Sequence, residues 1–217
     1  MSLFQALIFD LDGVIIDTES LHAQAKRLAF EKYALDVPEL WYQQFRGRSD
    51  QDMVESVVAE FGDSALSSAE VLALKHEVFS TLHENIMPVE GAVEFIQQAR
   101  QHFKQLALTT SATKQNQLFA FAKFGLQPYF DVVVTAEAIT HTKPHPEPYL
   151  KTVEKLGLPA AACLVIEDST NGILSAQGAG CAVAAITTSF SREELEAAQA
   201  DYIVHSFAEL ASLLGFG

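Results

Sequence analysis

Short, continuously apolar runs recur along the chain and alternate with helical patterns. The runs cover residues 6–9, 106–108, 132–134, 164–166 and 182–186. Such a run is typical of a strand buried on both faces of a parallel sheet. The helical patterns cover residues 114–124, 146–156, 171–178 and 191–199, and the first two end at Gly125 and Gly157, which favour a helix end. This alternation predicts a Rossmann-like, doubly wound parallel α/β sheet.

Residues 17–87 have a different pattern, which predicts helices and no strand. Apolar residues recur there at helical spacing, for example Met53, Val54, Val57, Val58 and Phe61. Ser49-x-x-Asp52 resembles a capping box, and Ser67-x-x-Glu70 opens a further helix in the same way. We therefore predict an all-helical domain of residues 17–87, inserted into an α/β core made of residues 1–16 and 88–217.

The composition is that of a folded protein with a sizeable core. Of the 217 residues, 49% are hydrophobic and 19% are charged, which excludes a disordered protein. Cys163 and Cys181 lie in apolar contexts without a Cys-x-x-Cys or Cys/His pattern. This predicts buried, reduced thiols rather than a zinc site or a disulfide scaffold.

The net charge is strongly negative, at −14. Such a protein repels phosphate backbones and anionic lipid, so we expect neither nucleic acid nor a membrane surface as a partner. No basic region precedes the first apolar run, and the uncharged stretch 169–191 is rich in polar residues and glycine. We therefore expect no secretory signal, no membrane span and a cytoplasmic location.

Candidate chemistry follows the apolar runs, because ligands of an open α/β sheet bind beyond the carboxyl ends of its strands. The residues that follow four of the runs are Asp10 and Asp12, Thr109 to Ser111, Lys143, and Glu167 with Asp168. They would bring four carboxylates, several hydroxyls and one lysine to the same edge of the sheet.

The acidic residues suit catalysis and metal binding. Asp10-x-Asp12 puts two carboxylates on one side of an extended segment, where one can act as a nucleophile or metal ligand and the other as a general acid/base. An acidic turn or a helix cap is the alternative. Glu167 and Asp168 repel each other unless a cation lies between them, which suits Mg²⁺; the alternative is an N-cap of the next helix.

Lys143 and Ser111 suit the binding of a phosphoryl group. Neighbouring prolines stiffen the loop around Lys143 and would hold its ammonium group in place, and Ser111 could donate to a phosphate oxygen at a helix start. A surface lysine and a simple helix cap are the alternatives. The sequence contains no GxxxxGK(S/T), GxGxxG or GxSxG pattern, which excludes P-loop kinases, dinucleotide oxidoreductases and elbow-type serine hydrolases.

Taken in order, these motifs resemble those of the haloacid dehalogenase-like (HAD) superfamily. The four matching segments are Phe9-Asp10-Leu11-Asp12-Gly13-Val14, Leu108-Thr109-Thr110-Ser111-Ala112, Lys143-Pro144 and Glu167-Asp168-Ser169. The resemblance covers essentially the whole chain. The helical insertion resembles the cap domain of the subgroup that holds β-phosphoglucomutase, phosphoglycolate phosphatase and small sugar-phosphate phosphatases.

The resemblance implies a catalytic and metal-binding role for the acidic motifs. Asp10 would attack phosphorus and become an aspartyl phosphate, while Asp12 would protonate the leaving alcohol and then activate water. Asp10, the backbone carbonyl of Asp12, and Asp168 would hold Mg²⁺, with Glu167 close by.

The resemblance also implies that Ser111, Ala112 and Lys143 hold the transferring phosphoryl group. Phosphoryl transfer needs positioning and neutralisation of the phosphoryl oxygens, which Mg²⁺ and a lysine supply. The same positive charges would let a small phosphate ester bind to an acidic protein.

Candidate substrate residues lie in the helical domain. Arg46, Gly47 and Arg48 form a basic turn in an acidic segment and are candidates for binding a substrate anion or sugar hydroxyls, with a solvated turn as the alternative. His22 matches the histidine in the D(S/T)-E-x-x-H pattern of relatives, with a helix-surface histidine as the alternative. Lys75 is a further candidate.

Asp50 favours a phosphatase over a mutase. The mutase pattern has a second phosphate-binding arginine at this position, where an acidic residue would repel a distal phosphate. We therefore expect a Mg²⁺-dependent phosphatase, a monomer or weak dimer, that hydrolyses a small phosphorylated metabolite such as a sugar phosphate. The alternatives are a β-phosphoglucomutase-like mutase, a catalytically inactive HAD-like binding protein, and a receiver-type module, which is shorter and lacks the helical insertion.

Overall fold

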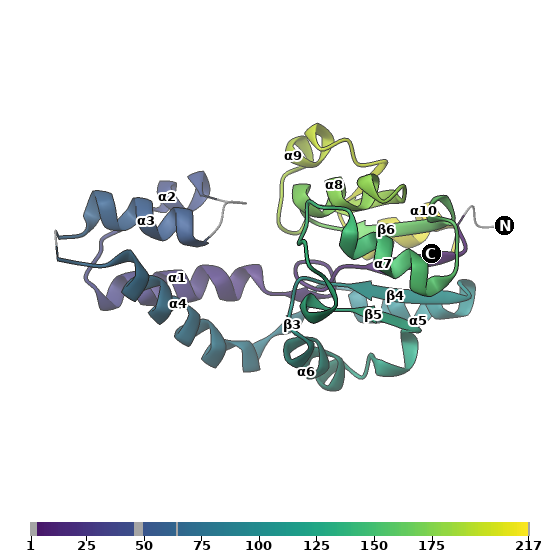
Figure 1. The fold of residues 1–217 in the computed structure, drawn as a ribbon, viewed down its shortest axis with the longest axis horizontal. Helices are drawn as coiled ribbons and strands as arrows, with labels where there is room; N and C mark the ends of the chain where they lie inside the picture. The colour runs from purple at the N-terminus through teal and green to yellow at the C-terminus, as the bar shows by residue number, and fades with distance from the viewer. Residues whose placement is uncertain (1–3, 46–49, 64, 217) are drawn as a thin grey trace. The chain divides into compact units, whose positions relative to one another are not determined.

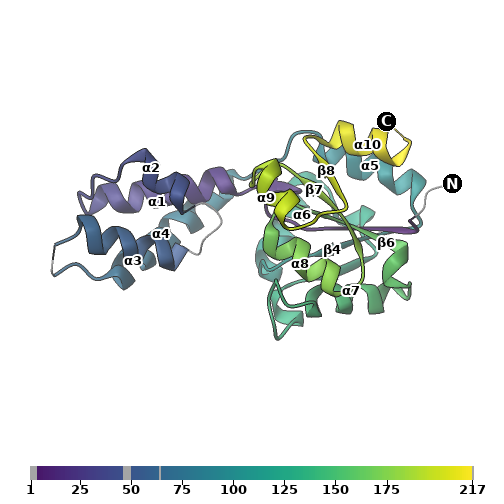
Figure 2. The same cartoon turned by 90° about the horizontal axis from the view of Figure 1, so that it is seen from above.

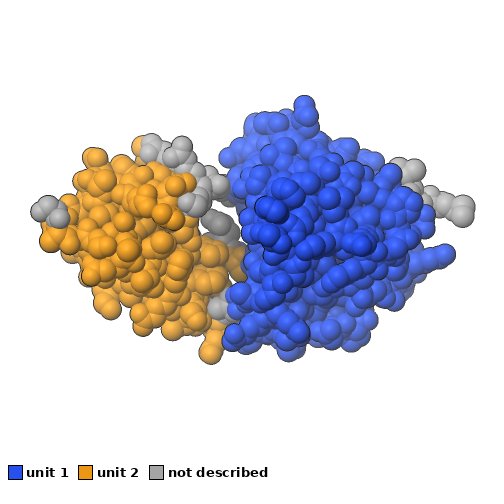
Figure 3. Space-filling model, in the orientation of Figure 1, with its two compact units in different colours: residues 1–17, 87–217 blue, residues 18–86 orange. Residues whose placement is uncertain are grey.

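The computed structural model describes residues 4–45, 50–63 and 65–216. The chain divides into two compact units, which Figure 3 shows in different colours. The core unit comprises residues 1–17 and 87–217, and the helical unit comprises residues 18–86. Each unit has a hydrophobic core of its own.

A six-stranded parallel sheet forms the centre of the core unit (Figure 1). In sheet order, the strands are β5 (Val132–Val134), β4 (Gln105–Thr109), β1 (Ala6–Phe9), β6 (Cys163–Glu167), β7 (Ala182–Ile186) and β8 (Tyr202–Val204). The direction of winding reverses at β1, which pairs with β4 on one side and β6 on the other. This confirms the predicted doubly wound α/β fold. Ligands of such sheets bind at the switch point, beyond the carboxyl ends of the strands.

Helices cover both faces of the sheet. The helices of the core unit are α5 (Ala92–His102), α6 (Lys114–Phe124), α7 (Glu147–Leu156), α8 (Thr170–Gly178), α9 (Arg192–Ala197) and α10 (Phe207–Leu214), with short 3-10 helices at η2 (Gln127–Tyr129), η3 (Ala136–Ala138) and η4 (Ala160–Ala162). The pair α5 and α10 lies on one face, and α7 and α8 lie on the other (Figure 2). α6 and α7 end at left-handed Gly125 and Gly157, as the sequence predicts.

The two strands that carry most of the candidate residues are completely buried. Every residue of β1 and β6 is 0% exposed. Tyr149 from α7 and Ile173 from α8 join Ile8 and Val165 of these strands in one hydrophobic cluster. Because apolar side chains are covered on both faces, the strands are continuously apolar rather than alternating, and their ends are rigidly positioned.

The chain leaves and re-enters the core unit through a two-stranded antiparallel ribbon. It consists of β2 (Ile16–Asp17) and β3 (Met87–Pro88), with Ile16 opposite Pro88 and Asp17 opposite Met87. The ribbon brings the two ends of the helical insertion side by side. Residues 18–86 are therefore a separate compact unit inserted into the sequence of the core unit.

The helical unit contains α1 (Glu19–Lys32), α2 (Glu39–Gln44), α3 (Asp50–Phe61), α4 (Ser68–Leu82) and the short 3-10 helix η1 (His83–Asn85). Its described residues form no strand. Phe30, Val57 and Val71 are at most 1% exposed and contribute to its core, where Trp41 meets Phe61 edge to face at 5.0 Å. Among the helices of the described part of the chain, none is long and apolar enough to cross a membrane.

Candidate active site

Asp10 lies directly beyond the central strand β1, where a tight turn begins. Its N–H donates to the carbonyl of Ile166 on β6 at 3.0 Å, which extends the strand pairing by one residue. The N–H groups of Ile15 and Ile16 then donate to the carbonyl of Leu11 at 2.8 and 3.0 Å. These bonds hold Asp10 at the switch point of the sheet, with only 8% of the residue exposed.

Gly13 lets this turn lie against the end of β6. Its φ is +74°, in the left-handed region that favours glycine. A Cβ at this position would overlap the carboxylate of Asp168 and the hydroxyl of Ser189. Both backbone conformation and space therefore require glycine here, and its absence of a side chain lets the turn approach Asp168.

Strand β6 delivers Glu167 and Asp168 beside this turn. Oε2 of Glu167 accepts hydrogen bonds from the N–H groups of Asp168 and Ser169 at 3.1 and 3.2 Å and from the Ser169 hydroxyl at 3.0 Å. The hydroxyl of Tyr149 on α7 donates to Oε1 at 2.7 Å. Glu167 is thus a buried carboxylate that accepts hydrogen bonds from several donors.

Lys143 joins the ends of three strands. Its Nζ donates to Oδ1 of Asp10 at 2.8 Å, to Oε1 of Glu167 at 2.6 Å and to the carbonyl of Thr109 on β4 at 3.4 Å. The ammonium also lies 5.0 Å from the centre of the Tyr149 ring. The lysine side chain is 9% exposed, which excludes the surface-lysine alternative.

Burial shifts the pKa values of the carboxylates. It raises the pKa of Asp10 to about 7 against the opposing effect of Lys143, and the charges of Glu167 and Asp12 raise it further. Burial also raises the pKa of Asp168 well above its usual range, as do the charges of Glu167 and Asp10, although Ser189 donates to this carboxylate. Negative charge at this edge is therefore incompletely compensated by the protein.

The Glu167–Lys143 pair behaves differently. Burial alone would raise the pKa of Glu167, but the charge and hydrogen bond of Lys143 hold it below its usual value. Burial alone would lower the pKa of Lys143, but Asp10 and Glu167 raise it above its usual value. Both members of this pair are therefore ionised at neutral pH.

The donor set fits a divalent cation. One oxygen each from Asp10, Glu167 and Asp168 lies within 4.8 Å of the others, and all three residues are buried. Three carboxylates around one lysine leave a buried negative charge that a hard cation with oxygen ligands would compensate. This cluster, which we call the carboxylate cluster, is a candidate metal site.

The other predicted core residues lie on loops beside this cluster. Asp12 is half-buried in the turn after β1. Ser111 is exposed and Ala112 half-buried on the loop between β4 and α6, shortly after Thr109, whose carbonyl accepts from Lys143. The structure thus brings Lys143 into the carboxylate cluster and puts Asp12, Ser111 and Ala112 on adjoining loops.

Residues 7–186 match the family described as haloacid dehalogenase-like hydrolase. The chain belongs to this family. It is 33% identical to a phosphorylated carbohydrates phosphatase of Thermotoga maritima over 179 residues, which is 81% of this chain and 82% of that protein. It is 28% identical to validoxylamine A 7'-phosphate phosphatase of Streptomyces hygroscopicus subsp. limoneus over 212 residues, 96% of both chains.

Solved structures agree with this assignment. The crystal structure of a mutant of CbbY from Rhodobacter sphaeroides in complex with xylulose-(1,5)bisphosphate has a TM-score of 0.74 and 27% identity, and the match covers 95% of this chain and 96% of that one. The resemblance to the haloacid dehalogenase-like superfamily is therefore confirmed. This haloacid dehalogenase-like hydrolase is a phosphoric monoester hydrolase, as its motifs predict.

Two of the predicted substrate residues of this hydrolase contact each other within the helical unit. Nζ of Lys75, a residue that is 1% exposed, lies 2.8 Å from Nδ1 of His22 and forms an ion pair with Asp50. Lys26 lies 3.5 Å from Asp50, and the His22 ring stacks on Phe79 at 4.1 Å. The predicted residues Arg46, Gly47 and Arg48 lie outside the described residues.

In this helical-unit group, Lys75 compensates the charge of Asp50, and Lys26 adds a second positive charge beside it. Burial lowers the pKa of His22 to about 4, and the charge of Lys75 lowers it further. Burial would raise the pKa of Asp50, but the hydrogen bond and charge of Lys75 hold it below its usual value. Asp50 is therefore not the isolated negative charge that the sequence comparison with mutases assumes.

Two residues of the site were not predicted from the sequence. Ser189 follows β7 and donates to Asp168, so the strand-end rule would have found it if extended to the run at 182–186. Tyr149 lies in a predicted amphipathic helix, and its contact with Glu167 has no signal in the sequence.

Proposed function

We propose that this chain is a Mg²⁺-dependent phosphatase that hydrolyses a phosphorylated carbohydrate through an aspartyl phosphate on Asp10. The observation that carries the proposal is the Lys143 ammonium, 2.8 Å from Asp10 and 2.6 Å from Glu167, inside a buried group of three carboxylates. A nucleophilic carboxylate, a fixed cation and a cation-binding donor set are the groups that phosphoryl transfer requires.

In the first step, a carboxylate oxygen of Asp10 forms a bond to phosphorus as the bond from phosphorus to the substrate alcohol breaks. Asp12 gives its carboxyl proton to the departing oxygen, which leaves as a neutral alcohol. Lys143 neutralises charge on the phosphoryl oxygens, and Ser111 and the Ala112 N–H donate hydrogen bonds to them. The products are the alcohol and an aspartyl phosphate.

In the second step, water replaces Asp10 on phosphorus. Asp12, now a carboxylate, takes a proton from the attacking water. The bond between Asp10 and phosphorus breaks, which releases inorganic phosphate and regenerates the Asp10 carboxylate. Atoms and protons balance over the two steps as hydrolysis of one ester bond.

Asp10, Asp168 and the backbone carbonyl of Asp12 would hold Mg²⁺, with Glu167 near. When bound, the ion supplies Lewis-acid neutralisation of phosphoryl charge. The raised pKa values of Asp10, about 7, and Asp168 support a cation there, because it would favour their ionised forms.

The substrate class rests on the relatives and on the helical unit. Two of the relatives described above are named for phosphorylated carbohydrates and a validoxylamine phosphate. We propose that His22, Lys75 and the turn of Arg46, Gly47 and Arg48 select the substrate. Asp50 stands where the mutase pattern has a second phosphate-binding arginine, which favours a phosphatase over a mutase. We further propose a cytoplasmic monomer or weak dimer.

A phosphate-release screen tests the proposal. Sugar phosphates, phosphoglycolate and mononucleotides are incubated with the protein, with and without Mg²⁺. We expect Mg²⁺-dependent release that is greatest for one or more sugar phosphates, and none with Asp10→Asn. The exposed Asp36→Asn is the matched control and keeps full activity.

Two outcomes would contradict the proposal. Full release by Asp10→Asn would exclude the aspartyl phosphate, and radioactive phosphate trapped on Asp10 after acid quenching is the positive counterpart. Interconversion of a hexose 1-phosphate and 6-phosphate in the presence of a bisphosphate primer, without net release, would indicate the mutase instead.

A further inference from the structure

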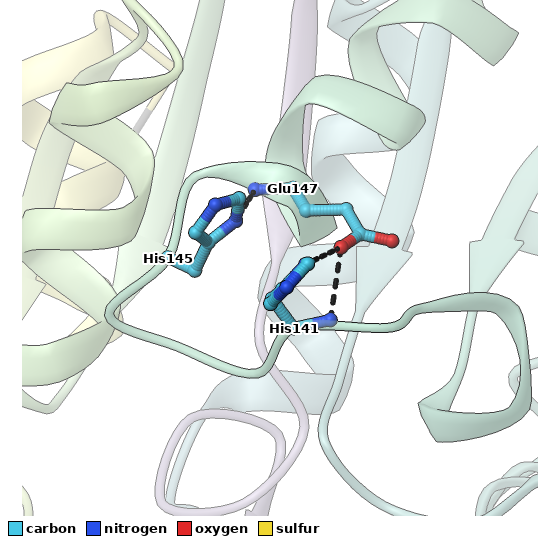
Figure 4. A group of neighbouring side chains, drawn as sticks. All are labelled: His141, His145 and Glu147. Carbon is cyan, nitrogen blue, oxygen red and sulfur yellow. Dashed lines mark hydrogen bonds and ion pairs between the residues drawn. The ribbon is translucent and has the colours of Figure 1, made fainter.

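A second group of potential metal ligands lies on the loop before α7 (Figure 4). His141, His145 and Glu147 each offer one ligand atom, and these atoms lie within 4.8 Å of one another. Both histidines are exposed, and Glu147 is half-buried. None of the three has a role in the mechanism proposed above.

The carboxylate of Glu147 is fixed by the protein before any ligand binds. Oε1 accepts from the N–H of Thr140 at 2.8 Å and pairs with Lys151 at 2.7 Å. Oε2 accepts from the N–H of His141 at 2.9 Å and lies 2.8 Å from Nδ1 of the same residue. A metal ion would bind this carboxylate and Nδ1 of His141 in place of the proton between them, because both groups bind metals in their deprotonated forms.

The imidazole rings of His141 and His145 stack on each other. Their centroids are 4.5 Å apart, with an interplanar angle of 29°. The N–H of Glu147 donates to Nδ1 of His145 at 3.1 Å. Because this hydrogen bond occupies the single lone pair of Nδ1, a metal ion would bind His145 either at Nδ1 in place of the N–H, or at Nε2 after a change of tautomer.

We propose that His141, His145 and Glu147 form a binding site for a divalent transition-metal ion of the Zn²⁺ class. Two imidazoles and one carboxylate suit Zn²⁺, Cu²⁺ or Ni²⁺, whereas the all-oxygen carboxylate cluster suits Mg²⁺. Zn²⁺ bonds of roughly 2.0–2.2 Å require the donor atoms to lie closer together than the 4.8 Å within which all three are found. Rotation of two exposed histidine side chains provides this closure.

The three proposed ligands lie on both sides of Lys143 in the sequence. An ion held by His141 at one end and by His145 and Glu147 at the other ties residues 141–147 together. The ion therefore stabilises this loop, and with it the core unit, by binding the folded state only. The effect requires no contact between the ion and the substrate.

Zn²⁺ titration in competition with a chromophoric chelator tests the site, with Mg²⁺ kept saturating so that the carboxylate cluster is occupied. We expect one Zn²⁺ site in the parent protein. His141→Gln and His145→Gln should each lower the Zn²⁺ affinity at least about tenfold, since loss of a residue that only orients a metal ligand already lowers metal affinity by this factor. His102→Gln, at an exposed histidine of α5, is the matched control and should leave it unchanged.

Cu²⁺ electron paramagnetic resonance gives a second readout that does not depend on folding stability. We expect hyperfine coupling of Cu²⁺ to two histidine nitrogens in the parent protein and to one in each single variant. The double variant, which combines His141→Gln and His145→Gln, should show coupling to neither. Unchanged Zn²⁺ affinity in the double variant, or Zn²⁺ binding that saturating Mg²⁺ abolishes, would overturn the proposal. Circular dichroism of the variants establishes that they are folded.

Discussion

Glu167 shows how a buried charge is made tolerable. The residue is 0% exposed, and an isolated carboxylate there would be strongly destabilising. Lys143, Tyr149 and Ser169 each donate a hydrogen bond to it. Because a buried charge depends on all its partners, loss of one donor should cost more than loss of a surface hydrogen bond.

Tyr149→Phe is the cleanest removal of one donor. It deletes the 2.7 Å bond to Glu167 and leaves the ring volume in the core unchanged. We expect the free energy of unfolding to fall by about 2 kcal/mol, the usual contribution of a hydrogen bond to a charged group. Urea unfolding measures the change. Tyr202→Phe, at a half-buried tyrosine of β8, should have a much smaller effect, and equal losses would contradict this account.

A comparison of Gly13→Ala with Gly215→Ala separates the effect of backbone strain from the effect of a steric overlap in the site. Gly13 and Gly215 have φ values of +74° and +80°, but only a Cβ at Gly13 would overlap another group, the Asp168 carboxylate. Both substitutions should destabilise the protein by about 1 kcal/mol through strain. Only Gly13→Ala should reduce the rate of phosphate release, by about 100-fold, because it displaces catalytic groups. Equal rates for the two variants would contradict this assignment.

At the scale of elements, the N-terminus of α8 is joined to the site through its cap. The Ser169 hydroxyl accepts from the N–H of Gly172 at 3.1 Å and donates to Glu167 at 3.0 Å. Thr113 caps α6 in the same way, accepting from the N–H of Asn116 at 3.3 Å. The serine thus fixes both the helix and the carboxylate that precedes it.

We expect Ser169→Ala to destabilise the protein by about 2 kcal/mol, against about 1 kcal/mol for Thr113→Ala. The difference arises because the first substitution removes both a cap and a donor to a buried charge. Thermal or urea unfolding measures both values. If the threonine variant proves as destabilised as the serine variant, the second hydrogen bond of Ser169 contributes nothing.

The contact between α1 and α4 should make the helical unit sensitive to acid. His22 has an ordinary pKa of 6.5 and a folded value of about 4, so the unfolded chain binds more protons between these values. The contribution of His22 to the free energy of unfolding is therefore fully present above about pH 6.5, and it is lost as the pH drops toward 4. With a discount for partial exposure, the loss is roughly 2 kcal/mol. Urea unfolding across this range should show it, and His22→Gln should show less; an identical pH dependence would exclude His22 as its source.

The sequence predicts those elements whose packing is reflected in a local pattern. The strands β1 and β7 were predicted with their observed bounds, because burial on both faces makes them continuously apolar. β5 and β8 each have three residues, of which two are only half-buried; the all-valine run of β5 was predicted, and β8, which begins with a tyrosine, was not. The ribbon of β2 and β3 has two residues in each strand, too few for any periodicity.

Prediction of the site has a similar limit. The residues immediately beyond the strands are accessible to sequence reasoning because the parallel topology brings strand ends together. Tyr149 is not, because which point of a helix face meets Glu167 depends on how α7 packs on the sheet. The charge environment of Asp50 also depends on packing, since Lys75 lies 25 positions away in the chain.

At the scale of the whole molecule, three of the acidic residues that give the net charge of −14 are gathered in the carboxylate cluster. Burial disfavours the ionised forms of Asp10 and Asp168, which raises their pKa values, and a bound cation would favour the ionised forms. A cation that binds only the folded core unit must therefore stabilise it.

We expect Mg²⁺ to increase hydrogen-exchange protection of β1 and β6 and to leave α1, α3 and α4 unchanged. At about 100 times the dissociation constant, the gain corresponds to about 2.7 kcal/mol. Exchange measured by mass spectrometry separates peptides of the two units. Asp168→Asn should remove the gain. Protection that rises equally in the helical unit would show that the ion does not act on the core unit alone.

The position of β1 in the sheet also has a consequence for synthesis on the ribosome. Ala6 pairs with Gln105 on one side and with Cys163 on the other. At roughly 5–20 residues per second, β1 waits on the order of ten seconds or more until its second neighbouring strand has been synthesised. The contacts that form the helical unit, by contrast, all lie within residues 18–86 and are available much earlier. The nascent chain is therefore expected to carry a folded helical insertion while strand β1 is still exposed to chaperones.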